Sequence, residues 1–155
     1  MEIMGSSLVK VDVHFIFHVK SSTGVTMDHM DLPRIFDYIG GIIKGMGSVP
    51  YAIGGMPDHI HFVAPLPKTI AIADFVRAIK AESSKWIKKL GPTYSCFAWQ
   101  DGYGAFSVSP TNLPNVVRYI GNQAVHHTTK SFEDEYKMFL DAYGVLYEER
   151  YVFSD

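Results

Sequence analysis

The sequence predicts an α+β domain with a ferredoxin-like antiparallel sheet (βαββαβ), with helices on one face and added C-terminal helices. Three observations lead to this prediction. Segments with strand periodicity and segments with helical periodicity follow one another in the order strand, helix, strand, strand, helix, strand. The chain has 155 residues, of which 47% are hydrophobic, enough for one core. Neither a linker nor a repeat divides it, so we expect residues 1–155 to form a single domain.

The first half of the chain contains three expected strands and one helix. Apolar and polar residues alternate from residue 9 to residue 19, which predicts a long, half-buried strand. The sequence Asp-Leu-Pro at residues 31–33 is typical of a helix start, and the helix should end near residue 44, before two glycines. Residues 49–54 and 58–65 are short apolar runs joined by a tight connection, which predicts adjacent strands.

A long amphipathic helix and the fourth strand should follow. From residue 70 to residue 90, the apolar side chains fall within one arc at about 100° per residue, with lysine and arginine largely opposite. Residues 94–99 have the apolar, aromatic character of a strand, and residues 105–108 look extended. The topology then places the first and third strands side by side at the centre of the sheet.

Two helices are expected at the C-terminal end. The first should run from Asn112 to about His127, with a proline in its first turn. Ser131 and Asp134 resemble a capping box, which predicts a short helix over residues 132–143. A glycine follows and ends that helix.

The composition restricts the function. The formal net charge is −2, so a generally basic surface for nucleic acid is not indicated, and any positive charge that serves this purpose must be local. The single cysteine, Cys96, has aromatic neighbours and is expected to be a buried thiol in a reducing compartment. No stretch approaches the roughly 18 apolar residues of a membrane span, and the N-terminus lacks a signal-like apolar run. We therefore expect a cytoplasmic protein without a membrane partner.

His59 and His61 form the first candidate site. Side chains two residues apart in a strand point the same way, so these two imidazoles could hold one metal ion. His14 and His18 of the neighbouring first strand could share their face of the sheet, and Asp58 could orient an imidazole. A His-x-His pair alone, however, is more often a surface or hydrogen-bonded pair. The metal interpretation therefore needs a third ligand.

Tyr119 and Gln123 could supply the missing groups. They are four residues apart on an expected helix and so project from the same face. The glutamine amide oxygen is a plausible third ligand, and a tyrosine phenol, whose pKa is ordinarily about 10, becomes a better nucleophile near a cation. On spacing alone, a tyrosine packed over the core with a solvated glutamine is the more common explanation.

Four ordered motifs give the chain a family resemblance. They are Met-Pro-Asp-His-Ile-His at residues 56–61, Ile-Lys-Ala-Glu-Ser-Ser at 79–84, Trp-Gln-Asp-Gly-Tyr-Gly-Ala-Phe-Ser-Val at 99–108, and Tyr-Ile-Gly-Asn-Gln-Ala-Val-His-His at 119–127. In this order they resemble the single-tyrosine HUH transposases of the smallest bacterial insertion sequences, in which HUH stands for His, hydrophobic, His. The resemblance extends over residues 9–152.

The resemblance implies a nuclease domain that cuts and rejoins single-stranded DNA at hairpin-bearing ends, as a homodimer, through a 5′-phosphotyrosine. It implies that His59, His61 and Gln123 bind Mg²⁺ or Mn²⁺ and that Tyr119 is the nucleophile. In one departure, many relatives carry a Lys-Tyr-Arg-like stretch after the first strand, whereas this chain has Lys-Ser-Ser-Thr-Gly at residues 20–24. The resemblance therefore assigns no DNA contacts to that loop.

Two sets of supporting residues complete the expectation. The first set consists of basic side chains that are candidates for contacts with DNA phosphates, although a solvated lysine face would explain the same helical pattern of charges equally well. The second set consists of one aspartate and four histidines that are candidates for proton transfer or for holding the metal ligands in place. The first set is Lys80, Lys85, Lys88 and Arg118, and the second is Asp58, His14, His18, His126 and His127.

Other functions remain possible at this point. One is a domesticated repeat-processing enzyme or a replication-initiator-like HUH nicking enzyme, which only the DNA substrate would distinguish from a transposase. Another is a non-catalytic protein that binds single-stranded DNA and has kept the fold.

Overall fold

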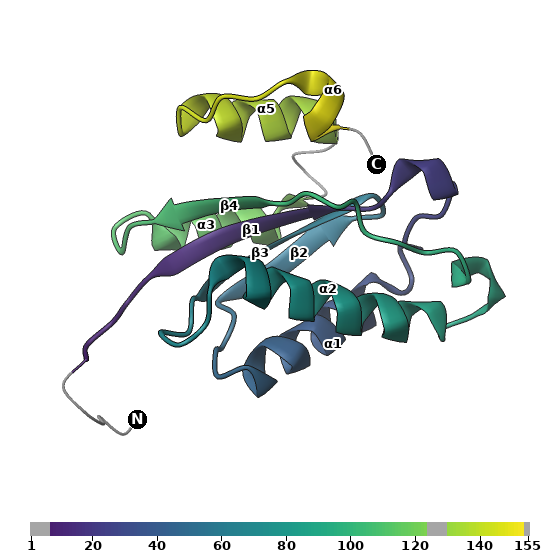
Figure 1. The fold of residues 1–155 in the computed structure, drawn as a ribbon, viewed down its shortest axis with the longest axis horizontal. Helices are drawn as coiled ribbons and strands as arrows, with labels where there is room; N and C mark the ends of the chain where they lie inside the picture. The colour runs from purple at the N-terminus through teal and green to yellow at the C-terminus, as the bar shows by residue number, and fades with distance from the viewer. Residues whose placement is uncertain (1–6, 124–129, 154–155) are drawn as a thin grey trace.

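A computed structural model describes residues 7–123 and 130–153 of the chain. Strands and helices alternate along these residues in the order that the sequence predicts (Figure 1). In chain order the elements are β1 (Asp12–His18), η1 (Ser21–Thr23), α1 (Leu32–Gly45), β2 (Ala52–Met56), β3 (His59–Pro65), α2 (Ile72–Lys88), η2 (Pro92–Tyr94), β4 (Gly104–Val108), α3 (Leu113–Gly121), α5 (Phe132–Ala142) and α6 (Glu149–Val152).

The four strands form one antiparallel sheet in the order β2-β3-β1-β4. The prediction that the first and third strands are central neighbours is therefore confirmed. In the register of these two strands, His14 lies opposite Val63 and His18 lies opposite His59. The histidines of β1 consequently share a face of the sheet with those of β3.

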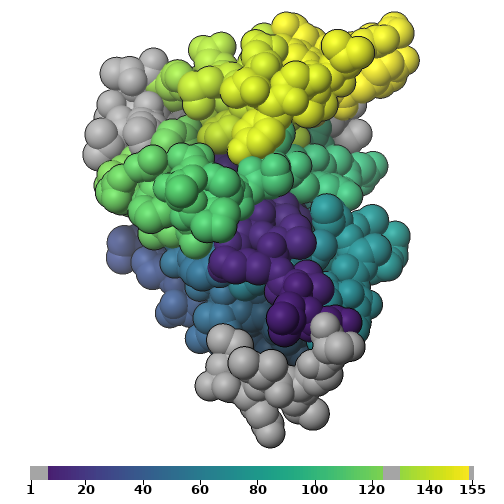
Figure 2. All heavy atoms as spheres, turned by 90° about the vertical axis from the view of Figure 1, so that its left-hand side faces the viewer, coloured from purple at the N-terminus to yellow at the C-terminus, as the bar shows by residue number. Residues whose placement is uncertain are grey.

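Different helices cover the two faces of the sheet. Phe15 and Phe17 of β1 point into the main hydrophobic core beneath α1 and α2. Residues His14 and Ile16, which alternate with them, point to the opposite face. That second face is covered by α3, which packs on Val63, and by α5, which packs on Ile16. Figure 1 shows α5 across the sheet from α1 and α2, and Figure 2 shows the C-terminal segment in yellow on the far side of β1 from them.

The fourth strand differs from the prediction. Residues 94–99 are not a strand, since only an isolated bridge between Val19 and Trp99 joins this stretch to the rest of the sheet. The buried side chains of Phe97 and Trp99 enter the main core from irregular backbone, so their apolar character reflects burial and not strand pairing. The strand is instead β4, which the sequence indicates only as an extended segment. Cys96 is exposed, so the expectation of a buried thiol is wrong.

Two local features hold the helices of the second face in place. The Ser131 hydroxyl accepts a hydrogen bond from the Asp134 backbone N–H at 3.2 Å, which confirms the predicted helix start of α5. In β2, Gly54 lies so close to α3 that a Cβ atom there would be 2.3 Å from the carbonyl oxygen of Ile120. The absence of a side chain at Gly54 thus allows α3 to rest directly on the sheet.

α3 begins close to the expected position but ends at Gly121, with Asn122 as its C-cap, so the expectation of one helix that carries both Tyr119 and Gln123 is wrong. The part of the expected helix from residue 124 to residue 127 lies outside the described residues. Among the described helices, none combines the length and the apolar character that crossing a membrane requires.

Candidate active site

His59 and His61 lie on β3 beneath α3 and α5, and both side chains are 0% exposed. Strand periodicity turns both imidazoles toward the second face of the sheet, as the sequence predicts. Their ring centroids are 5.2 Å apart. The pair is therefore presented on one side of a rigid, central strand.

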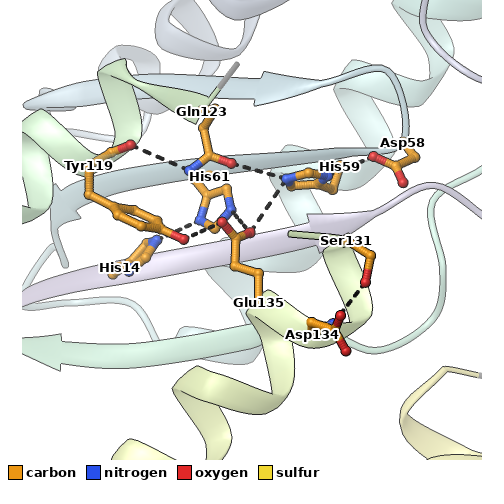
Figure 3. A network of polar contacts seen from close by, with 9 residues as sticks. All are labelled: His14, Asp58, His59, His61, Tyr119, Gln123, Ser131, Asp134 and Glu135. Carbon is orange, nitrogen blue, oxygen red and sulfur yellow. Dashed lines mark hydrogen bonds and ion pairs between the residues drawn. The ribbon is translucent and has the colours of Figure 1, made fainter. Parts of the chain in front are cut away.

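A neighbouring side chain orients each imidazole through its Nδ1 atom (Figure 3). His59 Nδ1 donates to Asp58 Oδ1 at 2.7 Å. Burial raises the pKa of the Asp58 carboxyl, but the hydrogen bond and charge of His59 and the charge of His18 together outweigh this effect, and the pKa is lowered. His14 Nε2 lies 2.8 Å from His61 Nδ1, and burial followed by the nearby His61 charge holds the pKa of His14 well below its usual range. The Nε2 atoms of His59 and His61 are thus left to face a common space.

Gln123 and Tyr119 approach this space from the second face. Gln123 Oε1 is 3.1 Å from His59 Nε2, while the Gln123 amide nitrogen donates to the Tyr119 backbone oxygen at 3.4 Å. The Tyr119 ring stands edge-on to His61, with centroids 5.9 Å apart. The structure therefore brings together, within one chain, the four side chains that the sequence proposes as metal ligands and nucleophile.

Glu135 also belongs to the site, although it is not among the residues proposed from the sequence. It lies on α5, is 1% exposed, and its Oε1 atom is 2.7 Å from His61 Nε2 and 3.5 Å from His59 Nε2. Its Oε2 atom accepts a hydrogen bond from the Tyr119 hydroxyl. Burial would raise the pKa of this carboxyl, but the hydrogen bond and charge of His61, followed by the Tyr119 hydrogen bond, outweigh burial and lower the pKa to about 2. Glu135 is therefore ionised at neutral pH.

A signal for Glu135 is present in the sequence. The residues Phe132, Tyr136 and Leu140 form the buried, apolar stripe of α5. Glu135 falls within this stripe, because it lies three residues after the first of them and next to the second. A carboxylate on the buried side of an amphipathic helix requires polar partners.

The donor set fits a divalent metal ion. With a proton on His59 Nδ1, the Nε2 atom of this residue presents a lone pair toward the oxygens of Gln123 and Glu135. One ligand atom each from His59, His61 and Glu135 can be chosen so that all lie within 4.8 Å of one another. Converging nitrogen and oxygen lone pairs, together with one negative charge, are what a cation of this type needs.

The other histidine candidates are placed differently. His18 is half-buried and stacks on the Phe132 ring, with centroids 4.5 Å apart, opposite His59 in the register. His126 and His127 lie outside the described residues, so their proposed roles stay predictions.

Three of the basic candidates are far from this site in the fold. Lys80, Lys85 and Lys88 lie on α2, which covers the opposite face of the sheet, whereas Arg118 is exposed on α3 and contacts Asn115. Lys85 and Lys88 are exposed. Only Arg118 is adjacent to Tyr119.

Lys80 is engaged by a loop. Its ammonium donates to the backbone oxygens of Gln100 at 2.6 Å, Gly102 at 2.7 Å and Asp101 at 3.3 Å. Burial lowers the pKa of Lys80 to about 8. Because an ammonium has three N–H donors, this pattern favours a structural role that holds the loop before β4.

The fold and the site together define a ferredoxin-like domain in which a buried His-hydrophobic-His pair faces a tyrosine on a neighbouring helix. The family model described as "Transposase IS200 like" matches residues 7–123, and the chain belongs to this transposase family. A transposase of this family processes DNA, so the buried cluster lies in a DNA-processing domain.

Two solved structures have a similar fold. A candidate transposase from Deinococcus radiodurans R1, whose crystal structure has a resolution of 1.90 Å, is 24% identical with a TM-score of 0.59, over 79% of this chain and 98% of that chain. A REP-associated tyrosine transposase bound to a REP hairpin is 16% identical with a TM-score of 0.54, over 82% of this chain and 74% of that chain. No curated protein matches the sequence significantly.

Proposed function

We propose that this protein is a transposase that cuts and rejoins single-stranded DNA at hairpin-bearing ends through a covalent 5′-phosphotyrosine at Tyr119. One observation carries the proposal: the Tyr119 hydroxyl and the Nε2 atom of His61 meet at the same buried carboxylate. A nucleophile and a candidate metal centre are thereby within one small site. The hairpin bound by the REP-associated relative supports the choice of DNA substrate.

The proposed reaction is a transesterification. Tyr119 Oη attacks the scissile phosphorus in line, the Oη–P bond forms, and the P–O3′ bond breaks. The leaving 3′-oxygen takes a proton to become a hydroxyl, and the 5′-phosphate stays on the tyrosine. Attack by a second 3′-hydroxyl on the phosphotyrosine rejoins the DNA. Because the phosphodiester is exchanged and not hydrolysed, no nucleotide cofactor is needed.

Metal binding is proposed for His59, His61 and Gln123. A bound Mg²⁺ or Mn²⁺ ion supplies Lewis-acid polarisation of a non-bridging phosphate oxygen and offsets negative charge in the transition state. Asp58 and His14 position the two imidazoles through the contacts on their Nδ1 atoms.

The proton on Tyr119 must leave during attack. Burial, followed by the hydrogen bond and charge of Glu135, raises the pKa of Tyr119 above its usual value, so the phenol is protonated in this arrangement. Its proton is directed at Glu135 Oε2. His14, another sequence candidate for proton transfer, instead contacts His61.

DNA could approach Tyr119 through an adjacent cavity. This cavity has a volume of about 240 Å³ and is lined by His14, Asn112, Asn115 and Phe139, among others. We propose that exposed basic side chains contact the DNA backbone, that two copies form a homodimer, and that the protein acts in the cytoplasm as a single domain. The proposed phosphate contacts are Arg118, Lys85 and Lys88.

A covalent-adduct assay tests the function. A hairpin oligonucleotide with a 3′ fluorescent label is incubated with the protein and Mg²⁺ or Mn²⁺, and denaturing electrophoresis reports label attached to protein. Wild type and Tyr38→Phe, a control on α1, should form the adduct, whereas Tyr119→Phe should not. Excess EDTA should abolish it. An adduct that persists in Tyr119→Phe, or one that carries only a 5′ label, would contradict the proposed chemistry.

Complete burial of His59 and His61 favours a second candidate, a hairpin-binding protein that does not cleave. That protein would retain the labelled hairpin in a native gel but give no adduct with any divalent metal. A domesticated repeat-processing enzyme or an initiator-like nicking enzyme would form the adduct, but with chromosomal repeats or an origin sequence as its preferred substrate.

A further inference from the structure

Glu135 uses its two carboxylate oxygens for two different parts of the site. Oε1 faces the imidazoles of His59 and His61, and Oε2 holds the Tyr119 hydroxyl. Figure 3 shows this carboxylate lying between the tyrosine and the two histidines. No other described side chain of the C-terminal helices α5 and α6 belongs to the histidine-carboxylate cluster.

We propose that Glu135 couples the metal centre to the nucleophile, with Oε1 as a further ligand of the ion held by His59 and His61 and Oε2 positioning Tyr119. This inference rests on the proposed function, since it assigns an additional residue to the same site. It makes α5 a part of the active site and not merely a cover over the sheet.

The distances suit shared coordination. Neighbouring ligand atoms around a small divalent ion with bonds of about 2.0–2.1 Å lie about 3 Å apart. Glu135 Oε1 is 2.7 Å from His61 Nε2 and 3.5 Å from His59 Nε2, while Gln123 Oε1 is 3.1 Å from His59 Nε2. The side chains of His59, His61 and Glu135 are therefore already spaced as ligands of one ion, and Gln123 lies at ligand spacing from His59.

Charge and ligand type favour the same assignment. His59, His61 and Gln123 offer three neutral donors, which leave the two positive charges of an ion uncompensated. The Glu135 carboxylate adds a negative charge inside a site where water cannot screen it. Mg²⁺ and Mn²⁺ also prefer carboxylate oxygen to imidazole nitrogen. A carboxylate in this position would therefore strengthen binding of either ion.

Contacts from α5 also fix the tyrosine. In addition to the Glu135 hydrogen bond, the Phe139 ring of α5 stands edge-on to the Tyr119 ring, with centroids 5.7 Å apart. Binding of an ion at Oε1 would hold the carboxylate, and the carboxylate would hold the hydroxyl. The same carboxylate would then hold both the ion and the nucleophile.

Metal titration of matched variants tests the ligand role. Isothermal titration with Mn²⁺ compares wild type, Glu135→Gln and Glu133→Gln, an exposed control on the same helix with the same change of charge. Glu135→Gln should raise the dissociation constant by more than the roughly tenfold to 100-fold that loss of a partner behind the ligands costs, because a direct ligand is removed. Glu133→Gln should bind as wild type does.

The coupling needs a readout at Tyr119. Protein labelled with ¹³C at the tyrosine ζ carbon is titrated with Mg²⁺, and the Tyr119 signal is assigned by its loss in Tyr119→Phe. The signal should shift with Mg²⁺ in wild type and Glu133→Gln, and it should not respond in Glu135→Gln. If Glu135→Gln does not fold, Glu135→Asp, which keeps the charge but withdraws the carboxylate by one methylene group, serves in both titrations.

The outcomes separate this inference from the proposed function. An unchanged Mn²⁺ dissociation constant in folded Glu135→Gln overturns the ligand role, and a Tyr119 signal that still responds to Mg²⁺ there overturns the coupling. Wild-type protein that binds Mn²⁺ through Glu135 but forms no DNA adduct would refute the transposase chemistry and leave the coupling standing. Wild-type protein that binds no metal would overturn both.

Discussion

Replacing Gly54 with alanine should displace the helix that carries Tyr119. The Cβ atom would lie 2.3 Å from the carbonyl oxygen of Ile120 and 3.2 Å from its Cγ2 atom, whereas ordinary contact begins at 3.4 Å. Backbone atoms of β2 and α3 must therefore separate by about 1 Å, since the clash is with backbone that cannot rotate away. Tyr119 immediately precedes Ile120 and would move with it.

The displacement has two measurable consequences. A misplacement of about 1 Å in a reacting group costs about 100-fold in rate, so the initial rate of adduct formation in Gly54→Ala should fall by about this factor. Overpacking should lower the free energy of unfolding by about 1–3 kcal/mol in urea titrations. Rates are compared per folded molecule, with the folded fraction taken from circular dichroism.

Gly41→Ala is the matched control. Gly41 lies within α1, and a Cβ atom there would face open space, with no contact within 4 Å beyond its own helix. Alanine there should stabilise the protein by about 0.5–1 kcal/mol and leave the adduct rate unchanged. If Gly54→Ala matched wild type in both rate and stability, the direct contact of α3 with β2 would be refuted.

Three further changes test other parts of the structure. The pKa of the Glu135 carboxyl is lowered from 4.5 to about 2 in the folded protein. The ionised carboxylate therefore contributes to stability above pH 4.5, and this contribution is lost as the pH falls toward 2. The unfolding free energies of wild type and Glu135→Gln, measured as a function of pH, should converge over this window. Lys80→Met removes three hydrogen bonds to the loop and should cost about 1–3 kcal/mol in urea unfolding, whereas Lys88→Met should keep its stability and weaken hairpin binding in salt titrations. Ser131→Ala removes the N-cap of α5 and should cost about 1 kcal/mol, with faster hydrogen exchange confined to α5.

Local periodicity accounts for the parts of the site that could be predicted. A two-residue repeat sets His59 and His61 on one face of β3. The four-residue spacing predicts that Tyr119 and Gln123 approach the same place, and both do so although α3 ends between them at Gly121. The strand order then brings His14 to His61. Each of these placements follows from the direction of side chains within one element or from one standard topology.

Glu135 could not be placed in the same way. Its partner His61 is 74 residues away in the chain, and their contact depends on how α5 docks over the sheet. The buried stripe of α5 indicates that the carboxylate needs partners, but not which ones. Lys80 shows the same limit. Its position on a basic helix predicts an exposed side chain, but in the structure the loop at residues 100–102 covers its ammonium group.

The fourth strand illustrates a different limit. Residues 94–99 and residues 104–108 both contain buried aromatic side chains. Composition therefore predicts burial for both, but backbone pairing selects only the second. The bridge between Val19 and Trp99 marks where pairing with β1 is interrupted and the chain turns aside.

The hydrophobic cluster beneath α5 is separate from the main core. It contains Ile16 and Phe106 of the sheet and the apolar stripe of an 11-residue helix. A helix held by a small satellite cluster can open at a fraction of the free energy of global unfolding. His59 and His61 are fully buried beneath this helix, so transient opening of α5 would give a DNA phosphate a second route to them, besides the cavity next to Tyr119. Substitutions in the apolar stripe of α5 could therefore change access to the site without altering Glu135, Tyr119 or the two histidines.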